Sequence, residues 1–345
     1  MCIRDRFIRG DILNIDFDAV YYEPNIFNYQ LGLELKNKFN NLPWIEIESH
    51  NRIPQLSSLE NKSFPKLKQH LILGTRKTHK YVENHKVSDW LVPYTSSGCR
   101  AMCLYCYLVC NYNKCSYLRI FVNREEMMDK ILKFHKKHSV SQTYEIGSNS
   151  DLILENHITN NLPWTIETFA QNANGRLTFP TKFDMVDPLL NINHQGKTIF
   201  RMSVNPEEII KKIEIGTSNL SQRIKALNKM ANANYPVGIL IAPVILVDNW
   251  RELYENLIDE LSEQLDKKVK STGFIEIILM TYSYVHNAIN QEAFPNAIQL
   301  YDQSLMTGRG RGRYCYRYNL RKEAETFFQD MIAKKLPKMK ILYIS

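Results

Sequence analysis

The chain has 345 residues, of which 44% are hydrophobic and 23% charged, with 13 glycines and 13 prolines. This composition is typical of a folded globular protein and excludes a disordered, collagen-like or disulfide-stapled chain. The net charge is 44 − 36 = +8, which allows a polyanionic partner, and no run of about 20 apolar residues predicts a membrane helix.

The first six residues, MCIRDR, are considered apart from the fold. They are encoded by ATG-TGT-ATA-AGA-GAC-AG, a string that resembles a transposase adaptor, so we interpret residues 1–6 as a sequencing artefact. Removing Arg4, Asp5 and Arg6 lowers the net charge from +8 to +7. No signal-peptide hydrophobic region follows, which predicts a cytoplasmic, reducing compartment.

The expected elements divide the chain into three regions. Residues 7–88 are expected to form a small N-terminal α+β cap, with strands at 19–22, 44–48 and 70–74 and a helix at 31–39. Residues 89–285 alternate between short apolar runs and amphipathic stretches, which predicts a parallel sheet with right-handed crossovers. Its expected strands are 91–95, 143–147, 176–181, 198–204, 237–242 and 274–279, and its expected helices are 124–137, 160–172, 184–191, 218–232 and 250–265. Six such units suit an α/β fold with an open, partial (β/α)6 barrel, whose functional groups gather at the carboxyl ends of the strands.

Five cysteines lie within seventeen residues, on the loop after the first expected barrel strand: Cys99, Cys103, Cys106, Cys110 and Cys115. The first three have the spacing C-x3-C-x2-C, so they could bind three irons of a cubane [4Fe-4S] cluster and leave the fourth iron open. A zinc site formed with Cys110 or Cys115 is an alternative, although zinc sites usually need a second C-x2-C pair. A chance cluster of free thiols is the second alternative.

The C-x3-C-x2-C spacing is the signature of radical S-adenosylmethionine (AdoMet) enzymes, and within that superfamily this chain resembles the spore photoproduct lyase family. The CLYCY run at 103–107 carries the resemblance, which covers nearly the whole chain from about residue 19. Other matching segments are YEP (22–24), LG (31–32), GTRKT (74–78), YLRIFVN (117–123), FPTKF (179–183), GKTIFR (196–201), EIGTS (214–218) and IAP (241–243). The resemblance implies a radical-AdoMet partial barrel.

Polar side chains at the ends of the expected strands are candidates for binding AdoMet, whose carboxylate needs a cation or a hydroxyl. By resemblance, Lys182 and Ser203 hold the methionine carboxylate, Ser150 contacts the ribose, and the backbone of Ala242 meets the adenine. The alternatives are ordinary helix caps for the serines and a solvated strand-end lysine.

A basic, aromatic hairpin is expected in the C-terminal region, residues 286–345. Glycines at 308, 310 and 312 precede alternating tyrosines, which predicts a β-hairpin with tyrosines on one face and an arginine and a cysteine on the other. Arg309, Arg311 and Arg313 would neutralise phosphates, and Tyr314 would stack on or wedge against a base. An arginine-rich solvated loop is the alternative. The family uses a hairpin near this place to enter DNA.

The resemblance implies a carbon–carbon lyase that restores two thymines from the photoproduct 5-thyminyl-5,6-dihydrothymine. It would act through a 5′-deoxyadenosyl radical generated from AdoMet at the cluster, on UV-damaged DNA, with an electron donor such as ferredoxin or flavodoxin and no membrane. Tyr105 and Tyr107 match the family's paired tyrosines, proposed to help return the radical to the cofactor. Packing against the cysteine loop is the alternative role for both.

One residue departs from the family. Its members carry a hydrogen-donating cysteine where this chain has Ser148, and a serine O–H bond is too strong for that role. Cys315 is the expected substitute, with Cys110 next. Two rival functions stay open: a radical-AdoMet enzyme acting on another nucleic-acid or small substrate, and a non-enzymatic iron–sulfur or zinc protein that binds DNA.

Overall fold

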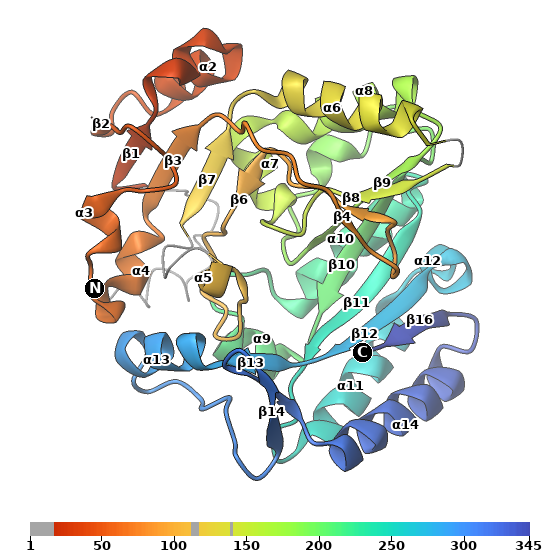
Figure 1. Ribbon diagram of the computed structural model, residues 1–345. Coiled ribbons are helices and arrows are strands. Elements are labelled where there is room, and N and C mark those ends of the chain that lie inside the picture. Colours follow the sequence, from red (N-terminus) through yellow and green to blue (C-terminus); the bar gives the residue numbers. More distant parts are fainter. Residues whose placement is uncertain (1–16, 112–116, 139–140) are drawn as a thin grey trace.

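The structure is a computed structural model that describes residues 17–111, 117–138 and 141–345 (Figure 1); residues 1–6 and Cys115 lie outside these ranges. Its largest element is an eight-stranded sheet in the order β16-β12-β11-β10-β9-β8-β5-β4, curled into a half-barrel. Neighbouring strands are parallel, except that β4 is antiparallel to β5. The strands are β4 (Val82–Glu83), β5 (Trp90–Leu91), β8 (Thr143–Glu145), β9 (Arg176–Thr181), β10 (Thr198–Val204), β11 (Val237–Val244), β12 (Phe274–Leu279) and β16 (Lys340–Ile344).

A 3-10 turn lies between β9 and β10, and helices lie in other connections between successive strands of this sheet. These helices are α7 (Leu152–Thr159) and α8 (Asn161–Asn172) before β9, α9 (Glu207–Ile213) and α10 (Leu220–Asn232) before β11, α11 (Trp250–Gln264) and α12 (Lys267–Thr272) before β12, and α13 (Tyr284–Ala293) and α14 (Tyr318–Lys335) before β16. The start of α10 shows how local sequence sets these bounds. The side chain of Asn219 accepts a hydrogen bond from the backbone of Gln222, whose side chain accepts one from the backbone of Asn219. This capping box satisfies backbone donors that the first turn leaves open.

A second sheet, in the order β2-β1-β3-β7-β6, contains the N-terminal strands. Its strands are β1 (Ala19–Tyr22), β2 (Trp44–Glu46), β3 (His70–Gly74), β6 (Ser96–Ser97) and β7 (Leu118–Phe121), and its helices are α2 (Gln30–Lys38), α3 (Pro54–Ser57) and α4 (Phe64–Leu67). Strands β6 and β7 precede and follow the cysteine-rich segment, and they pair with each other in antiparallel register. This sheet therefore anchors both ends of that segment.

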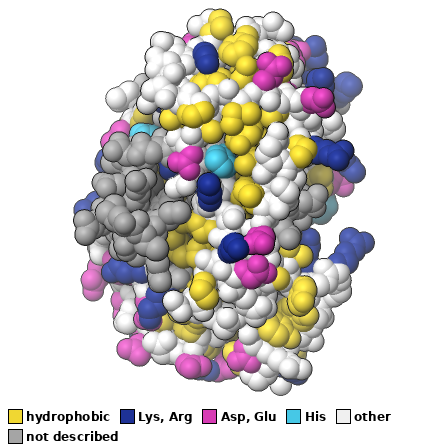
Figure 2. Space-filling view, turned by 90° about the vertical axis from the view of Figure 1, so that its left-hand side faces the viewer, with side chains coloured by type: hydrophobic (Ala, Val, Ile, Leu, Met, Phe, Trp, Pro, Cys, Tyr) yellow, Lys and Arg dark blue, Asp and Glu magenta, His cyan; other side chains and the backbone are white. Residues whose placement is uncertain are grey.

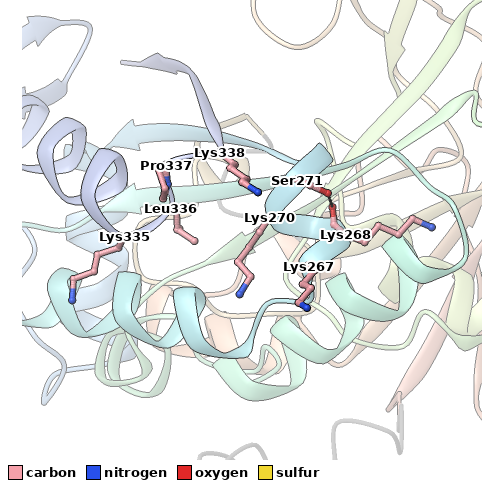
Figure 3. Close-up of a pocket in the computed structure, with 8 residues that line it drawn as sticks. All are labelled: Lys267, Lys268, Lys270, Ser271, Lys335, Leu336, Pro337 and Lys338. Carbon is pink, nitrogen blue, oxygen red and sulfur yellow. Dashed lines mark hydrogen bonds between the residues drawn. The ribbon is translucent and has the colours of Figure 1, made fainter.

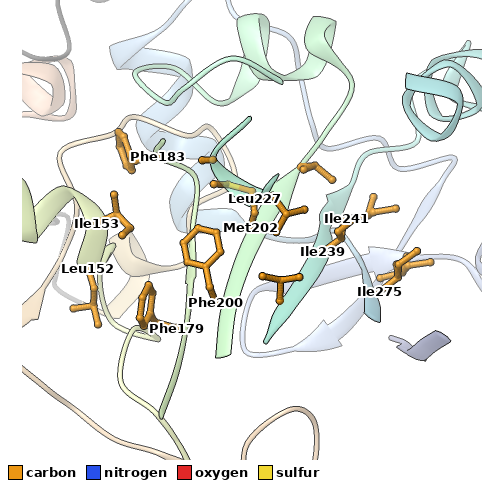
Figure 4. Close-up of a cluster of buried hydrophobic side chains, with 14 of the residues drawn as sticks. Leu152, Ile153, Phe179, Phe183, Phe200, Met202, Leu227, Ile239, Ile241 and Ile275 are labelled. Carbon is orange, nitrogen blue, oxygen red and sulfur yellow. The ribbon is translucent and has the colours of Figure 1, made fainter. Parts of the chain in front are cut away.

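The main hydrophobic core lies on the half-barrel. Every residue of the central strand β10 is buried, because a parallel sheet of this kind is covered on both faces. Figure 4 shows how side chains from several strands and from α7 and α10 meet there. The labelled residues are Leu152, Ile153, Phe179, Phe183, Phe200, Met202, Leu227, Ile239, Ile241 and Ile275.

The α/β fold class and its partial barrel are confirmed, and five expected strands coincide with β1, β3, β9, β10 and β12. Two expected elements are wrong. The strand expected at 91–95 ends at Leu91, because Pro93 has no N–H with which to continue a ladder, and β6 of the other sheet begins at Ser96. The helix expected at 184–191 is only a 3-10 turn, Asp187–Leu189, because Pro188 has no N–H to donate to the preceding turn of an α-helix.

A third sheet, in the order β13-β15-β14, forms the expected hairpin. Strands β14 (Met306–Gly310) and β15 (Arg313–Tyr316) pair as antiparallel neighbours, and β13 (Thr281–Ser283), which follows β12, pairs with β15. The hairpin is thus attached to the end of a barrel strand. Within the described part of the chain, no helix has the length and apolar character needed to cross a membrane.

Candidate active site

The cysteine loop lies between β6 and α5 (Leu108–Asn111) and is hydrogen-bonded on two sides. Gly98 has a φ of 77°, which favours glycine, and its N–H donates to the carbonyl of Asn149 at 2.8 Å. On the other side, the N–H groups of Met102 and Leu104 donate to carbonyls at the end of α9, at 2.8 and 3.0 Å. The barrel therefore holds the loop in a defined shape.

The three predicted cluster ligands form one group of reduced thiols. Cys103 is buried, and Cys99 and Cys106 are half-buried. Burial raises the pKa of Cys99 to about 12 and that of Cys103 well above its ordinary value, and the neighbouring thiols contribute in the same direction. These raised pKa values favour the protonated thiols. A bound metal cation would displace the protons and favour the thiolates.

Three thiols on one short loop are a donor set that fits a cubane cluster. Among the residues that the structure describes, no three His, Cys, Asp or Glu side chains are placed to hold one metal ion. A cubane cluster instead takes one thiolate per iron, so its ligands need not converge on a single point. The side chain of Cys110 and the whole of Cys115, the alternative zinc ligands, lie outside the described residues.

Three of the four predicted AdoMet-binding residues meet at the carboxyl edge of the half-barrel. Lys182 follows β9, Ser203 lies near the end of β10, and Ala242 lies near the end of β11. The ammonium of Lys182 donates to the hydroxyl of Ser203 at 2.5 Å and to the carbonyl of Ala242 at 2.8 Å. The hydroxyl of Ser203 in turn donates to the carbonyl of Ala242 at 3.0 Å.

A buried carboxylate that was not predicted lies at the centre of this group. The Oε1 atom of Glu214 lies 3.1 Å from the ammonium of Lys182, and its Oε2 atom lies 2.7 Å from the guanidinium of Arg223. Burial alone would raise the pKa of Glu214, but these two cations lower it to about 2. Glu214 begins the EIGTS segment, where its only sequence signal was the family match.

Ser150 belongs to a neighbouring network. Its hydroxyl lies 2.6 Å from that of Ser96, which donates to the buried carboxylate of Glu155 at 2.5 Å. In the described residues, no hydrogen bond joins Ser150 to Lys182, Ser203 or Ala242. Asp151 connects the two networks, because its carboxylate accepts the N–H of Lys182 at 3.0 Å and caps α7.

The paired tyrosines point in different directions. Tyr105 donates its hydroxyl hydrogen bond to the carboxylate of Glu214, and its ring centroid lies 5.7 Å from the ammonium of Lys182. Burial, followed by the charge of Glu214, raises the pKa of Tyr105 well above its ordinary value. Tyr107 is 58% exposed and donates to the backbone carbonyl of Ser148. The cysteine loop thus connects the Lys182 group with the backbone at Ser148.

The hairpin presents its arginines to solvent. Gly310, Arg311 and Gly312 form its turn with positive φ values of 81°, 52° and 67°, and Arg309, Arg311 and Arg313 are all exposed. Phosphates could reach all three side chains without a rearrangement of the core.

The tyrosine face of the hairpin packs inward. Tyr314 is half-buried, with its ring centroid 4.6 Å from that of Tyr301, and the hydroxyl of Tyr316 accepts the N–H of Leu246 at 2.9 Å. Cys315 lies on the opposite face, facing Thr281 and Thr307 in the register, and is 8% exposed. No hydrogen bond among the described residues links Cys315 to the Lys182 group.

Asn290 on α13 joins the hairpin sheet to the cysteine loop. Its side-chain amide donates to the carbonyl of Leu104 at 2.7 Å and to the hydroxyl of Tyr282 at 2.9 Å. Tyr282 pairs with Tyr314 across the sheet.

Other charged surfaces are less organised. Seen from the side of the N-terminal elements, the surface mixes hydrophobic, basic and acidic side chains (Figure 2). A pocket between α12 and the end of α14 is lined by five lysines (Figure 3). Lys335 pairs there with Asp259 at 2.6 Å, and Lys268 donates to Asn234 at 2.6 Å. None of the predicted site residues lines this pocket.

Comparison with known proteins shows relatives along nearly the whole chain. A family model described as spore photoproduct lyase matches residues 16–345. The chain is 33% identical over 335 residues to spore photoproduct lyase of Bacillus subtilis (strain 168), a match that covers 94% of this chain and 97% of that protein. It is 32% identical over 335 residues to spore photoproduct lyase of Geobacillus sp. (strain Y412MC61), covering 94% and 98%.

Solved structures agree with the sequence matches. A mutant spore photoproduct lyase with bound AdoMet and dinucleoside spore photoproduct superposes with a TM-score of 0.89 at 29% identity, covering 95% of this chain and 99% of that one. A spore photoproduct lyase complexed with dinucleoside spore photoproduct gives a TM-score of 0.89 at 28% identity, covering 96% and 99%.

Proposed function

Because the chain belongs to the spore photoproduct lyase family, we propose that it is a radical-AdoMet carbon–carbon lyase that repairs the spore photoproduct, a thymine dimer, in UV-damaged DNA. The observation that carries the proposal is the meeting of Lys182, Ser203 and Ala242 beside the C-x3-C-x2-C loop. These residues come from three different strands, and together with the loop they provide one place for a cluster and for AdoMet.

Each residue would have a separate task in holding the cofactors. Cys99, Cys103 and Cys106 would hold a [4Fe-4S] cluster, whose fourth iron stays open because no further ligand comes from the spacing. Lys182 and Ser203 would bind the AdoMet carboxylate by charge-assisted hydrogen bonds. The Ala242 backbone would meet the adenine, and Ser150 would contact the ribose. When bound, the cluster and AdoMet supply one-electron chemistry and hydrogen-atom abstraction, with an electron donor such as ferredoxin or flavodoxin.

The buried carboxylate supports this assignment. Glu214 holds the ammonium of Lys182 in a direction that keeps it between the ends of β9, β10 and β11. Arg223 balances the charge of Glu214, since both side chains are fully buried and lie 2.7 Å apart. Preorganising a cation in this way reduces the cost of orienting it when an anion binds.

We assign DNA contact to the hairpin. Arg309, Arg311 and Arg313 are exposed at its turn and would bind phosphates, which fixes position rather than sequence. Tyr314 packs against Tyr301, so contact of its ring with a base requires the ring to leave that position. The lesion has to leave the base stack, because a stacked dinucleotide cannot reach a buried cluster.

The hydrogen donor is assigned to Cys315. Ser148 cannot donate a hydrogen atom, since its O–H bond is much stronger than a thiol S–H bond. Cys315 is a free thiol in the hairpin, on the face opposite Tyr314. Cys110 is the second candidate. The alternative is that the enzyme acts on a different substrate, and the presence of Ser148 in place of a cysteine favours this alternative.

Anaerobic incubation with DNA that contains the lesion tests the function. Reconstituted protein, AdoMet and dithionite should convert the photoproduct to two thymines, measured by product analysis. AdoMet cleavage without thymine formation would favour a radical-AdoMet enzyme with another substrate. Loss of both reactions would favour a non-enzymatic DNA-binding protein.

A further inference from the structure

A buried lysine lies beneath the cysteine loop, although it comes from a distant part of the sequence. Lys68 follows α4 and is 1% exposed. Its ammonium donates to the carbonyl of Cys99 at 2.7 Å and lies 4.9 Å from the ring centroid of Phe64. Burying an ammonium is costly unless acceptors or opposite charges surround it, so the loop that it touches must supply part of that compensation.

The charge of Lys68 acts on all three predicted cluster ligands. Burial lowers the pKa of Lys68, and the thiols of Cys106, Cys99 and Cys103 oppose that effect as thiolates. Arg119 is a second buried cation near Lys68, and its positive charge lowers the pKa of Lys68. The ammonium of Lys68 lies against the loop that carries these three cysteines, at the carbonyl of Cys99.

We propose that Lys68 is a positioning residue that raises the reduction potential of the cluster, by keeping a positive charge against the loop that carries its ligands. The inference rests on the proposed function, because it presupposes a cluster on Cys99, Cys103 and Cys106. Reduction adds one negative charge to the cluster, and a cation held in a dry site stabilises that state more than the oxidised one. The hydrogen bond to Cys99 fixes the distance at which the charge acts.

Two variants separate charge from hydrogen bonding. Lys68→Met removes both the charge and the donor at similar volume, and Lys68→Gln removes the charge but keeps a donor. Lys66→Met is the matched control, because Lys66 lies two residues away and is exposed. Anaerobically reconstituted proteins, without DNA or AdoMet, are titrated with dithionite and mediators, and the midpoint potential is followed by electron paramagnetic resonance.

Both Lys68 variants should lower the ratio of reduced to oxidised cluster at a fixed potential by tenfold or more, which is about 59 mV for one electron. The Lys66→Met protein should match the wild type. A wild-type midpoint potential in Lys68→Gln, at full iron content, would overturn the proposal, even if Lys68→Met cannot hold its cluster. Iron analysis of the wild type separately tests whether a cluster is present, so a failure of the proposed function is distinguishable.

Discussion

The ammonium of Lys182 lies 2.5 Å from the hydroxyl oxygen of Ser203, although Lys182 follows β9 and Ser203 lies in β10. Strands β9 and β10 are parallel neighbours, so their carboxyl ends meet at one edge of the half-barrel. The same ammonium reaches Ala242 near the end of β11, the next strand, and Glu214 after α9. The sheet itself thus brings together the residues of the proposed carboxylate site.

Replacing Lys182 should weaken AdoMet binding. Lys182→Met removes a charge-assisted hydrogen bond worth about 1.5–3 kcal/mol, which corresponds to roughly 10- to 150-fold in Kd. Equilibrium binding of AdoMet to anaerobically reconstituted protein measures this change. Lys212→Met is the control, because Lys212 is exposed on α9 and pairs only with Glu208 in its own turn. Equal affinities in both variants would exclude Lys182 from the carboxylate site.

Iron content should distinguish the cluster ligands from the other cysteines. Cys103→Ala should abolish iron binding, because Cys103 is the buried central member of the C-x3-C-x2-C loop. Cys110→Ala and Cys115→Ala should keep the wild-type iron content. Iron analysis of anaerobically purified proteins measures both. Iron loss in Cys110→Ala equal to that in Cys103→Ala would contradict the ligand assignment.

Removing the hairpin arginines should change the salt dependence of DNA binding. Each phosphate contact contributes about −0.9 to the slope of log K against log salt concentration, so alanine at 309, 311 and 313 should make the slope shallower by about 2.7. AdoMet cleavage in the absence of DNA should persist. The matched control replaces Lys267, Lys268 and Lys338 of the distant pocket, which removes the same charge. An equal change of slope in the control would mean that the hairpin has no special role.

The hydrogen donor can be tested by moving the thiol. If Cys315 donates, Cys315→Ala should give incomplete thymine repair and side products, and Ser148→Cys in the same chain should restore clean repair. Product analysis on lesion DNA measures both. Clean repair by Cys315→Ala alone would remove Cys315 from the reaction. If the wild type is inactive and Ser148→Cys is active, the natural substrate is different.

Stability should depend on the ionisation of Glu214 at acidic pH. The half-buried Lys182 and the buried Arg223 hold the pKa of Glu214 at about 2, below the ordinary 4.5, so its contribution to folding is complete above pH 4.5 and is lost as pH falls towards 2. Denaturant unfolding of the metal-free protein should show a steeper loss of unfolding free energy in this window for the wild type than for Glu214→Gln. At pH 7 the variant should be less stable, because Lys182 and Arg223 lose their buried partner.

A matched substitution serves as the control for this pH effect. Glu252→Gln changes an exposed glutamate on α11, so its unfolding free energy should follow that of the wild type at every pH. If the unfolding free energies of the wild type and of Glu214→Gln change in parallel with pH, Glu214 is not the cause of the acid destabilisation.

Local sequence was sufficient for the elements and motifs that depend on near neighbours. The apolar runs of β9, β10 and β12 predicted those strands to the residue, because a covered parallel strand needs apolar side chains on both faces. The C-x3-C-x2-C motif could be recognised because its three cysteines lie close together on one short loop. Lys182 was predicted at the end of its strand, and parallel topology then makes such an end part of the site.

Tertiary structure alone decided which distant side chains share a charge or a hydrogen bond. Glu214 lies in the ion network with Lys182, and Lys68 lies beneath Cys99, because the fold brings together segments whose sequences show no common period. Tyr314 packs inward for a related reason: the alternation places tyrosines on one face of the hairpin, but only tertiary packing sets the ring of Tyr314 against Tyr301. Such pairings depend on where elements meet, and local patterns do not encode that.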